Sequence, residues 1–156
     1  KKMATTTATL TLSSADLLTD NLSLSATMNL YKGGTTATGL DELNYHRALV
    51  PTGTNFVLIS ESAALNTSGS NYVYIINKNT DVTDYVVVSI RSEVIGRLYA
   101  GDWMFIPYSD ATTATAGTDD PSGNDSDIAI QANTHDCIVE YAMFHDGETL
   151  LTHTAS

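Results

Sequence analysis

The residues of this 156-residue chain that could do chemistry are four histidines, one cysteine and eighteen aspartates and glutamates. His46, His135, His145 and His153 are scattered along the sequence, and no Gly-x-Ser-x-Gly elbow is present to hold a nucleophilic serine. A Ser-His-Asp site therefore has no local support in the sequence. We expect no catalytic residues and predict that the protein is not an enzyme.

Two segments contain residues that could bind a metal ion. His135 and Cys137 would share one face of a strand, but zinc needs more ligands and the chain has no second cysteine. The acidic stretch 119–127 offers oxygen ligands for calcium, but it lacks the alternating positions and terminal glutamate of an EF-hand loop. We predict no metal and no cofactor, and a buried, unreactive thiol at Cys137.

Aromatic and acidic side chains around residue 105 are the best candidates for binding a small ligand. Trp103 and Tyr108, beside Asp102 and Asp110, combine rings with carboxylates that accept hydrogen bonds from sugar hydroxyls. The competing interpretation places Trp103 in the hydrophobic core.

Arg47 and Arg97 are two of only three arginines, and each lies among apolar residues. Arginines in such positions often pair with buried carboxylates or bridge to a partner, so both are candidates for an ion pair or an interface. The alternative is an ordinary surface or intrachain pair.

The charge balance limits the choice of partner. Eighteen acidic and seven basic residues give a net charge of −11. DNA, RNA and anionic membranes are bound through clustered Lys and Arg, so neither a nucleic acid nor a membrane surface is an expected partner. No apolar run approaches the ~20 residues of a membrane span. Charged residues make up 16% of the chain, and Thr, Ser and Asn replace them, which suits a surface that faces other protein.

The elements that would position these residues are short β-strands. Residues 21–31 alternate strictly, which predicts a half-buried strand with Leu22, Leu24, Ala26, Met28 and Leu30 on its buried face. Further β-branched and aromatic runs are separated by Gly, Asn and Asp, and Gly101-Asp102 predicts a tight turn. Further strands are predicted at 4–12, 55–60, 71–77, 84–91, 127–132 and 136–144. The stretch 95–108 is predicted as two strands on either side of the Gly101-Asp102 turn, and 40–50 is ambiguous.

Eight to ten short strands without an amphipathic helix indicate an all-β fold. We predict a single domain over residues 1–156, an antiparallel two-sheet β-sandwich, with a jelly roll as one version of it. Residues 1–20 are a candidate N-terminal arm and 109–126 a long mobile loop. Residues 148–153 are predicted as an edge strand or a docking tail. Tyr72, Tyr74 and Tyr85 have few basic neighbours, so we expect them in the core or an interface.

The order of several segments resembles a known class of proteins. These segments are Tyr45-His-Arg47, the strand Tyr72–Asn77, the run Leu98–Pro107 with its Gly-Asp turn, and the closing strands Asp127–Ala132 and Val139–Phe144. Their order resembles small virion structural proteins of tailed bacteriophages, which decorate capsids or occur as minor tail and neck components. The likeness covers roughly residues 45–144, and the Thr-rich, charge-poor composition agrees with it.

The resemblance implies a capsid decoration or cement protein that bridges and stabilises capsid subunits, located on the virion surface. Its partner would be the major capsid protein or another virion protein, and the resemblance implies a homotrimer at sites of three-fold symmetry. The alternative function is a tail, neck or receptor-binding β-sandwich that binds carbohydrate.

Overall fold

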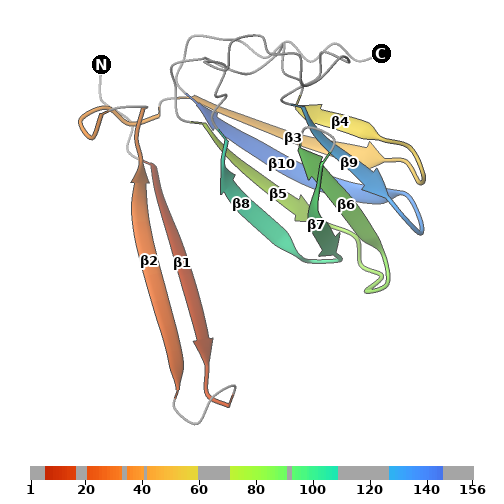
Figure 1. Cartoon of the computed structure of the whole chain (residues 1–156), viewed down its shortest axis with the longest axis horizontal. Helices are drawn as coiled ribbons and strands as arrows, with labels where there is room; N and C mark the ends of the chain where they lie inside the picture. Colours follow the sequence, from red (N-terminus) through yellow and green to blue (C-terminus); the bar gives the residue numbers. More distant parts are fainter. Residues whose placement is uncertain are drawn as a thin grey trace.

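Ten β-strands, without a helix, make up the part of the chain that the computed structural model describes (Figure 1). That part comprises residues 6–16, 21–32, 35–40, 42–59, 71–90, 93–108 and 127–145. Within these ranges nothing has the length and apolar character of a membrane-crossing helix. The strands are β1 Thr6–Ser14, β2 Leu22–Leu30, β3 Glu42–Val50, β4 Phe56–Ile59, β5 Tyr72–Asn77, β6 Tyr85–Ile90, β7 Glu93–Tyr99, β8 Trp103–Pro107, β9 Ile128–Ala132 and β10 Cys137–His145.

Eight of the strands form two four-stranded antiparallel sheets. The β10 sheet has the order β3-β10-β5-β8, and the β9 sheet has the order β4-β9-β6-β7. The hydrogen-bonded pairs are nested in sequence, because β3 pairs with β10, β4 with β9, β5 with β8, and β6 with β7. The sheets pack as a sandwich, so the predicted all-β antiparallel sandwich is confirmed.

The core lies between the two sheets and follows from the alternation of the strands. Val73 and Ile75 of β5 and Val86 and Val88 of β6 are fully buried, while the residues between them point outward. Val139 of the central strand β10 joins the same cluster. The ambiguous segment 40–50 contains β3, which pairs with β10 along its whole length.

The turn predicted at Gly101-Asp102 is confirmed. Gly101 joins β7 to β8 with φ +86°, a left-handed conformation that glycine adopts without strain. The Asp102 backbone nitrogen donates to the Tyr99 carbonyl oxygen at 2.9 Å, and the Tyr99 nitrogen donates to the Asp102 carboxylate at 3.0 Å.

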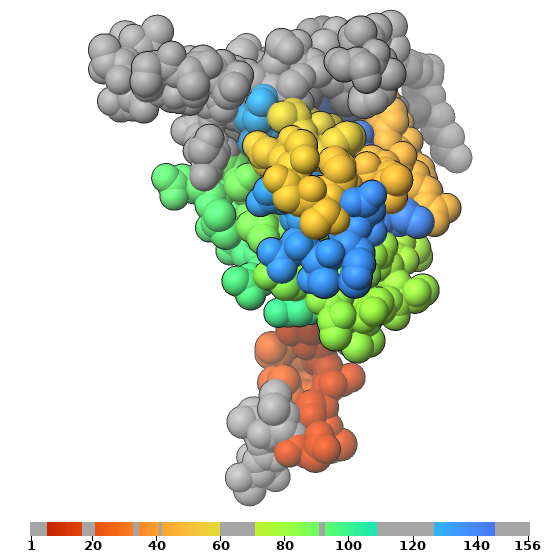
Figure 2. All heavy atoms as spheres, turned by 90° about the vertical axis from the view of Figure 1, so that its right-hand side faces the viewer, coloured from red at the N-terminus to blue at the C-terminus, as the bar shows by residue number. Residues whose placement is uncertain are grey.

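Strands β1 and β2 form a separate two-stranded hairpin that extends away from the sandwich (Figures 1 and 2). β1 lies within the candidate N-terminal arm and pairs with β2 from Thr6–Leu30 to Ser14–Leu22. The register separates two faces. One face is polar, where the Thr7 hydroxyl donates to Asn29 at 2.9 Å and Thr9 contacts Thr27 at 3.2 Å. The other face, called here the apolar ladder, contains Ala8, Leu10, Leu12, Leu22, Leu24, Ala26, Met28 and Leu30.

The predicted burial of this second face is wrong. Leu30, at the base of the hairpin, is buried, but Leu24 is 54% exposed and Met28 41% exposed. The alternation predicts the strand correctly, yet the hairpin leaves the sandwich and no other described element covers its apolar side. The predicted loops at 61–70 and 109–126 and the predicted strand at 148–153 lie outside the described residues.

Candidate functional site

The outer face of the β10 sheet is apolar, although it points away from the core. The strand registers align side chains in rows across this face, for example Tyr45, Ala142, Tyr74 and Phe105. Among its large side chains, Leu49 is 61% exposed and Trp103 is 52% exposed, with Leu43 and Tyr45 similar. An antiparallel sheet with one free side ordinarily shows polar residues there. This face therefore has the character of a contact surface.

The aromatic rings of this face pack against one another rather than standing free. Tyr72 and Phe105 stack with centroids 5.6 Å apart and planes 4° apart. Phe105 also meets Phe144 edge-on at 6.2 Å, and Tyr74 lies 6.2 Å from Trp103. Such contacts hold the rings in fixed positions and reduce the entropy that they lose when a partner covers them.

Among the strand residues of this face, only Arg47 and Glu140 are charged, and they lie close together. Arg47 Nε lies 3.8 Å from Glu140 Oε1, and the arginine side chain remains largely exposed. A hydrogen bond with Glu140 is the main reason that the pKa of Tyr45 is raised. An exposed pair at this distance contributes little stability, about 1 kcal/mol or less. Arg47 thus makes an intrachain pair on an exposed face, which is the alternative given for it.

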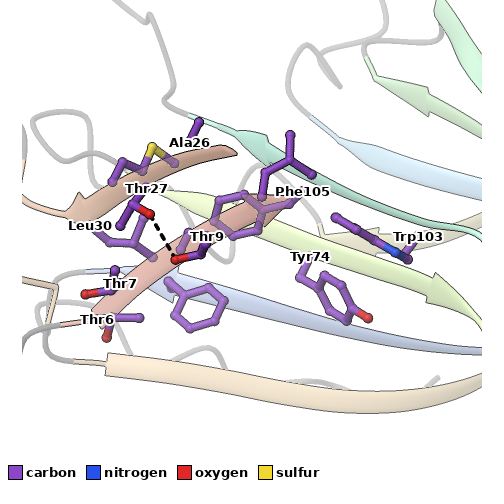
Figure 3. Close-up of a pocket in the computed structure, with 13 residues that line it drawn as sticks. Thr6, Thr7, Thr9, Ala26, Thr27, Leu30, Tyr74, Trp103 and Phe105 are labelled. Atoms are coloured by element: carbon purple, nitrogen blue, oxygen red, sulfur yellow. Dashed lines mark hydrogen bonds between the residues drawn. The ribbon is translucent and has the colours of Figure 1, made fainter. Parts of the chain in front are cut away.

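A pocket of about 500 Å³ separates the base of the hairpin from the outer face of the β10 sheet (Figure 3). The sheet contributes rings to one side of it, and the apolar ladder contributes Ala8, Leu10, Ala26, Met28 and Leu30 to the other. The rings are those of Tyr74, Trp103, Phe105 and Phe144. The apolar ladder and the sheet face thus border one apolar groove without filling it.

Of the four residues predicted to bind sugar, the structure describes Trp103, Tyr108 and Asp102, and it does not bring these three side chains together in one site. Trp103 lies exposed on β8, so its predicted alternative place in the core is wrong. Tyr108, beyond the other end of β8, is buried in the core, and its backbone nitrogen donates to Asn71 at 2.7 Å. The Asp102 carboxylate is engaged in the turn before β8. Asp110 lies outside the described residues.

Arg97 lies on the β9 sheet, away from Arg47. Its guanidinium carbon is 4.7 Å from the centre of the Tyr85 ring, a cation–π contact. The Tyr85 ring also lies 5.2 Å from the ring of Tyr99. Tyr85 thus lies on an outer face rather than in the core, as Tyr72 and Tyr74 do.

A polar cluster lies near the end of β5 and the starts of β6 and β10. Asp84 is buried and lies 2.7 Å from Nδ1 of His135, and Asn79 donates to its other oxygen at 2.8 Å. Asp84 raises the pKa of His135 through this hydrogen bond and through its charge. Cys137 is buried beside the cluster, as predicted, and burial raises the pKa of its thiol.

This cluster has the contacts of a structural network rather than of a reactive site. Asn79 also accepts a hydrogen bond from the Ile138 backbone nitrogen at 2.8 Å, which fastens β10 to the loop after β5. In the described ranges no three His, Cys, Asp or Glu residues are grouped so that they could hold a metal ion. Of the acidic stretch considered for calcium, only Asp127 is among the residues described.

The sequence reasoning missed five members of this surface and placed two more, Tyr72 and Tyr74, in the core or an interface. The five are Leu43, Tyr45, Leu49, Phe105 and Phe144. A signal for them exists in β10. Its outward-facing positions are Ile138, Glu140, Ala142 and Phe144, three of which are apolar, whereas a strand with one wet face would be polar there.

Comparison with known proteins finds no family model, no curated sequence and no solved structure that matches this chain.

Proposed function

We propose that this chain is a non-enzymatic structural protein of a bacteriophage virion, a decoration protein that binds where capsid subunits meet and bridges them. The proposal is carried by the exposed outer face of the β10 sheet together with the apolar ladder. Monomeric soluble proteins rarely expose apolar patches larger than a few hundred Å². Surfaces of this kind are expected to lie against other protein, while the assignment to a phage comes from the resemblance of residues 45–144.

We infer further that strands β3 to β10 form a jelly roll. The inference is supported by the nested pairing of the first of these strands with the last and of each inner pair in turn. A long hairpin folded over on itself into two four-stranded sheets produces this order. Viral capsid and lectin domains both use jelly rolls, so the topology is compatible with either shell assembly or sugar binding.

In the decoration role the protein acts by contact alone. Each copy contributes a modest interface, and many copies on one shell act together because binding of one contact raises the effective concentration of the next. Pre-packed rings on the β10 sheet lower the ordering cost of each contact. The expected result is a shell that resists heat and dilution better when the protein is bound.

The carbohydrate-binding alternative is favoured by one observation, the exposed Trp103 beside Tyr74. Two rings on a sheet face can stack on a sugar. Two other residues predicted to bind sugar are poorly placed for it, because Tyr108 is buried and the Asp102 carboxylate already accepts a backbone hydrogen bond. We therefore rank this function second.

Purified protein added to particles that lack it tests the proposal. We expect saturable binding and a higher temperature of shell opening. Replacement of Leu43 and Leu49 by Thr, on edge strand β3, should weaken shell binding, whereas Val82→Thr with Val94→Thr should not, because those exposed valines lie elsewhere.

Trp103→Ala, on the opposite edge strand β8, separates the two functions. Failure of the wild-type protein to bind shells, together with glycan binding that Trp103→Ala abolishes and the β3 variant retains, would replace decoration by sugar recognition.

A further inference from the structure

We propose that the apolar ladder of the hairpin packs on the outer face of the β10 sheet of a second copy of this chain. This inference rests on the proposed function in so far as it takes the protein to work as an assembly. In it the two surfaces bind copies of the chain to one another, so the weaker shell binding expected for the Leu43 and Leu49 variant follows from loss of the assembly.

The hairpin needs a cover that the described part of its own chain does not supply. A two-stranded hairpin alone is marginally stable in water, and it becomes stable when its apolar face packs on another surface. Here the polar face is a run of Thr, Ser and Asn, while Leu10, Leu12, Leu24 and Met28 on the ladder are each about half exposed. This division into one wet and one dry face is typical of strands with one side buried.

The outer face of the β10 sheet matches the ladder in length and in charge. β1, β2, β3 and β10 are each nine residues long, so the ladder and the β3–β10 pair extend over equal distances. Neither hairpin strand contains a charged residue, and the sheet face has only the Arg47–Glu140 pair. Two copies, each with a net charge of −11, could therefore meet here without bringing acidic groups together.

Within one copy the two surfaces do not pack together, because the pocket of about 500 Å³ lies between the base of the hairpin and the sheet. Exchange between copies covers both apolar surfaces, because each copy gives its ladder to one contact and its sheet face to another.

The area is sufficient for a specific complex when two copies exchange hairpins reciprocally. If a large side chain offers about 200 Å², the four half-exposed residues of each surface supply on the order of 400 Å² to each contact. Two copies that exchange hairpins make both contacts with each other and bury on the order of 800 Å² per copy, which is the area of a stable interface. The eight residues are Leu10, Leu12, Leu24, Met28, Leu43, Tyr45, Leu49 and Trp103.

Sedimentation velocity on the full chain and two double variants tests the pairing. The hairpin variant is Leu12→Thr with Leu24→Thr, a cross-strand pair distant from the sandwich, and Thr keeps the strand propensity. The sheet variant is Leu43→Thr with Leu49→Thr. Each should weaken self-association at least about tenfold per leucine replaced. The control with Thr at Val82 and Val94 should associate as the wild type does, because both valines lie outside the two surfaces.

Mixing the hairpin variant with the sheet variant gives the sharpest result. Each retains the surface that the other lacks, so the mixture should associate more strongly than either variant alone. A sheet variant that associates normally while the hairpin variant does not would mean that hairpins pair with hairpins, and would overturn the proposal.

A wild-type chain that remains monomeric at about 100 µM, above the dissociation constants usual for this area, would also overturn the proposal. A monomer that still binds shells refutes this inference and leaves the proposed function intact. Self-association that depends on the ladder, in a protein that does not bind shells, supports this inference and refutes the proposed function.

Discussion

Truncation of Asn77 should be among the most destabilising single changes in the sandwich, because this buried side chain links the two sheets. Asn77 ends β5, and its amide nitrogen donates to the carbonyl oxygen of Leu98 on β7 at 3.0 Å. The same nitrogen lies 3.4 Å from the carbonyl oxygen of Asp84, and the amide oxygen accepts from the Asn79 backbone nitrogen at 3.0 Å. Asn77→Ala removes all three contacts, and the Asn77 side chain itself is fully buried.

The expected cost follows from the number of buried groups that lose a partner. A buried donor or acceptor left unsatisfied costs roughly 1–3 kcal/mol. Counting the two shorter bonds and giving the 3.4 Å contact little weight, we expect Asn77→Ala to lower the free energy of unfolding by about 3 kcal/mol. Since small domains have only about 5–15 kcal/mol in total, this is a large fraction of the stability.

Urea unfolding followed by tryptophan fluorescence measures the difference, with Asn29→Ala as a matched control. Asn29 also makes two side-chain hydrogen bonds, to Thr7 and Tyr31, but on the exposed face of the hairpin, where water can replace them. The control should therefore cost about 0.5 kcal/mol or less. A difference of less than about 1 kcal/mol between the two variants would show that burial does not raise the cost of losing the Asn77 hydrogen bonds.

Three further results are expected. His135→Asn should remove a contribution to stability that is complete below pH 6.5 and is lost as the pH rises through the higher native pKa of His135, measured by unfolding at several pH values; an unchanged pH profile would contradict this. Cys137 should react with a thiol reagent only on unfolding, because burial raises the pKa of its thiol; rapid labelling of native protein would show otherwise. Gly101→Ala should lower stability by about 1 kcal/mol because φ is +86°, whereas Gly96→Ala, at an ordinary φ with open space around it, should cost less, as thermal melts can establish.

The strands of the sandwich could be predicted from the sequence because local alternation records them directly. Val73 and Ile75 of β5, for example, alternate with outward-facing residues and prove to be fully buried. The Gly101 turn is also local, since only a few residues determine it. The pairing of β3 with β10 could not be predicted in this way, because no residue near either strand specifies a partner so distant in sequence.

The candidate site could be predicted only in part, for a related reason. Alternation in β2 indicates that one face is apolar, but not whether another element covers it, so the burial of Leu24 and Met28 was predicted wrongly. Trp103 was judged by its type, since large aromatic residues are usually buried, whereas its position on the outer side of β8 is a consequence of register with β5.

The central position of β10 also has a consequence for the folding and synthesis of the chain. β10 lies between β3 and β5, and Asn44 contacts His145 at 2.7 Å across 101 residues of sequence. The β10 sheet cannot be completed until the ribosome has released residues near 145, so β3 and β5 must wait with unpaired edges. Long-range pairing of this kind slows folding to milliseconds or longer. We expect chains truncated before β10 to aggregate rather than to form a smaller stable sheet.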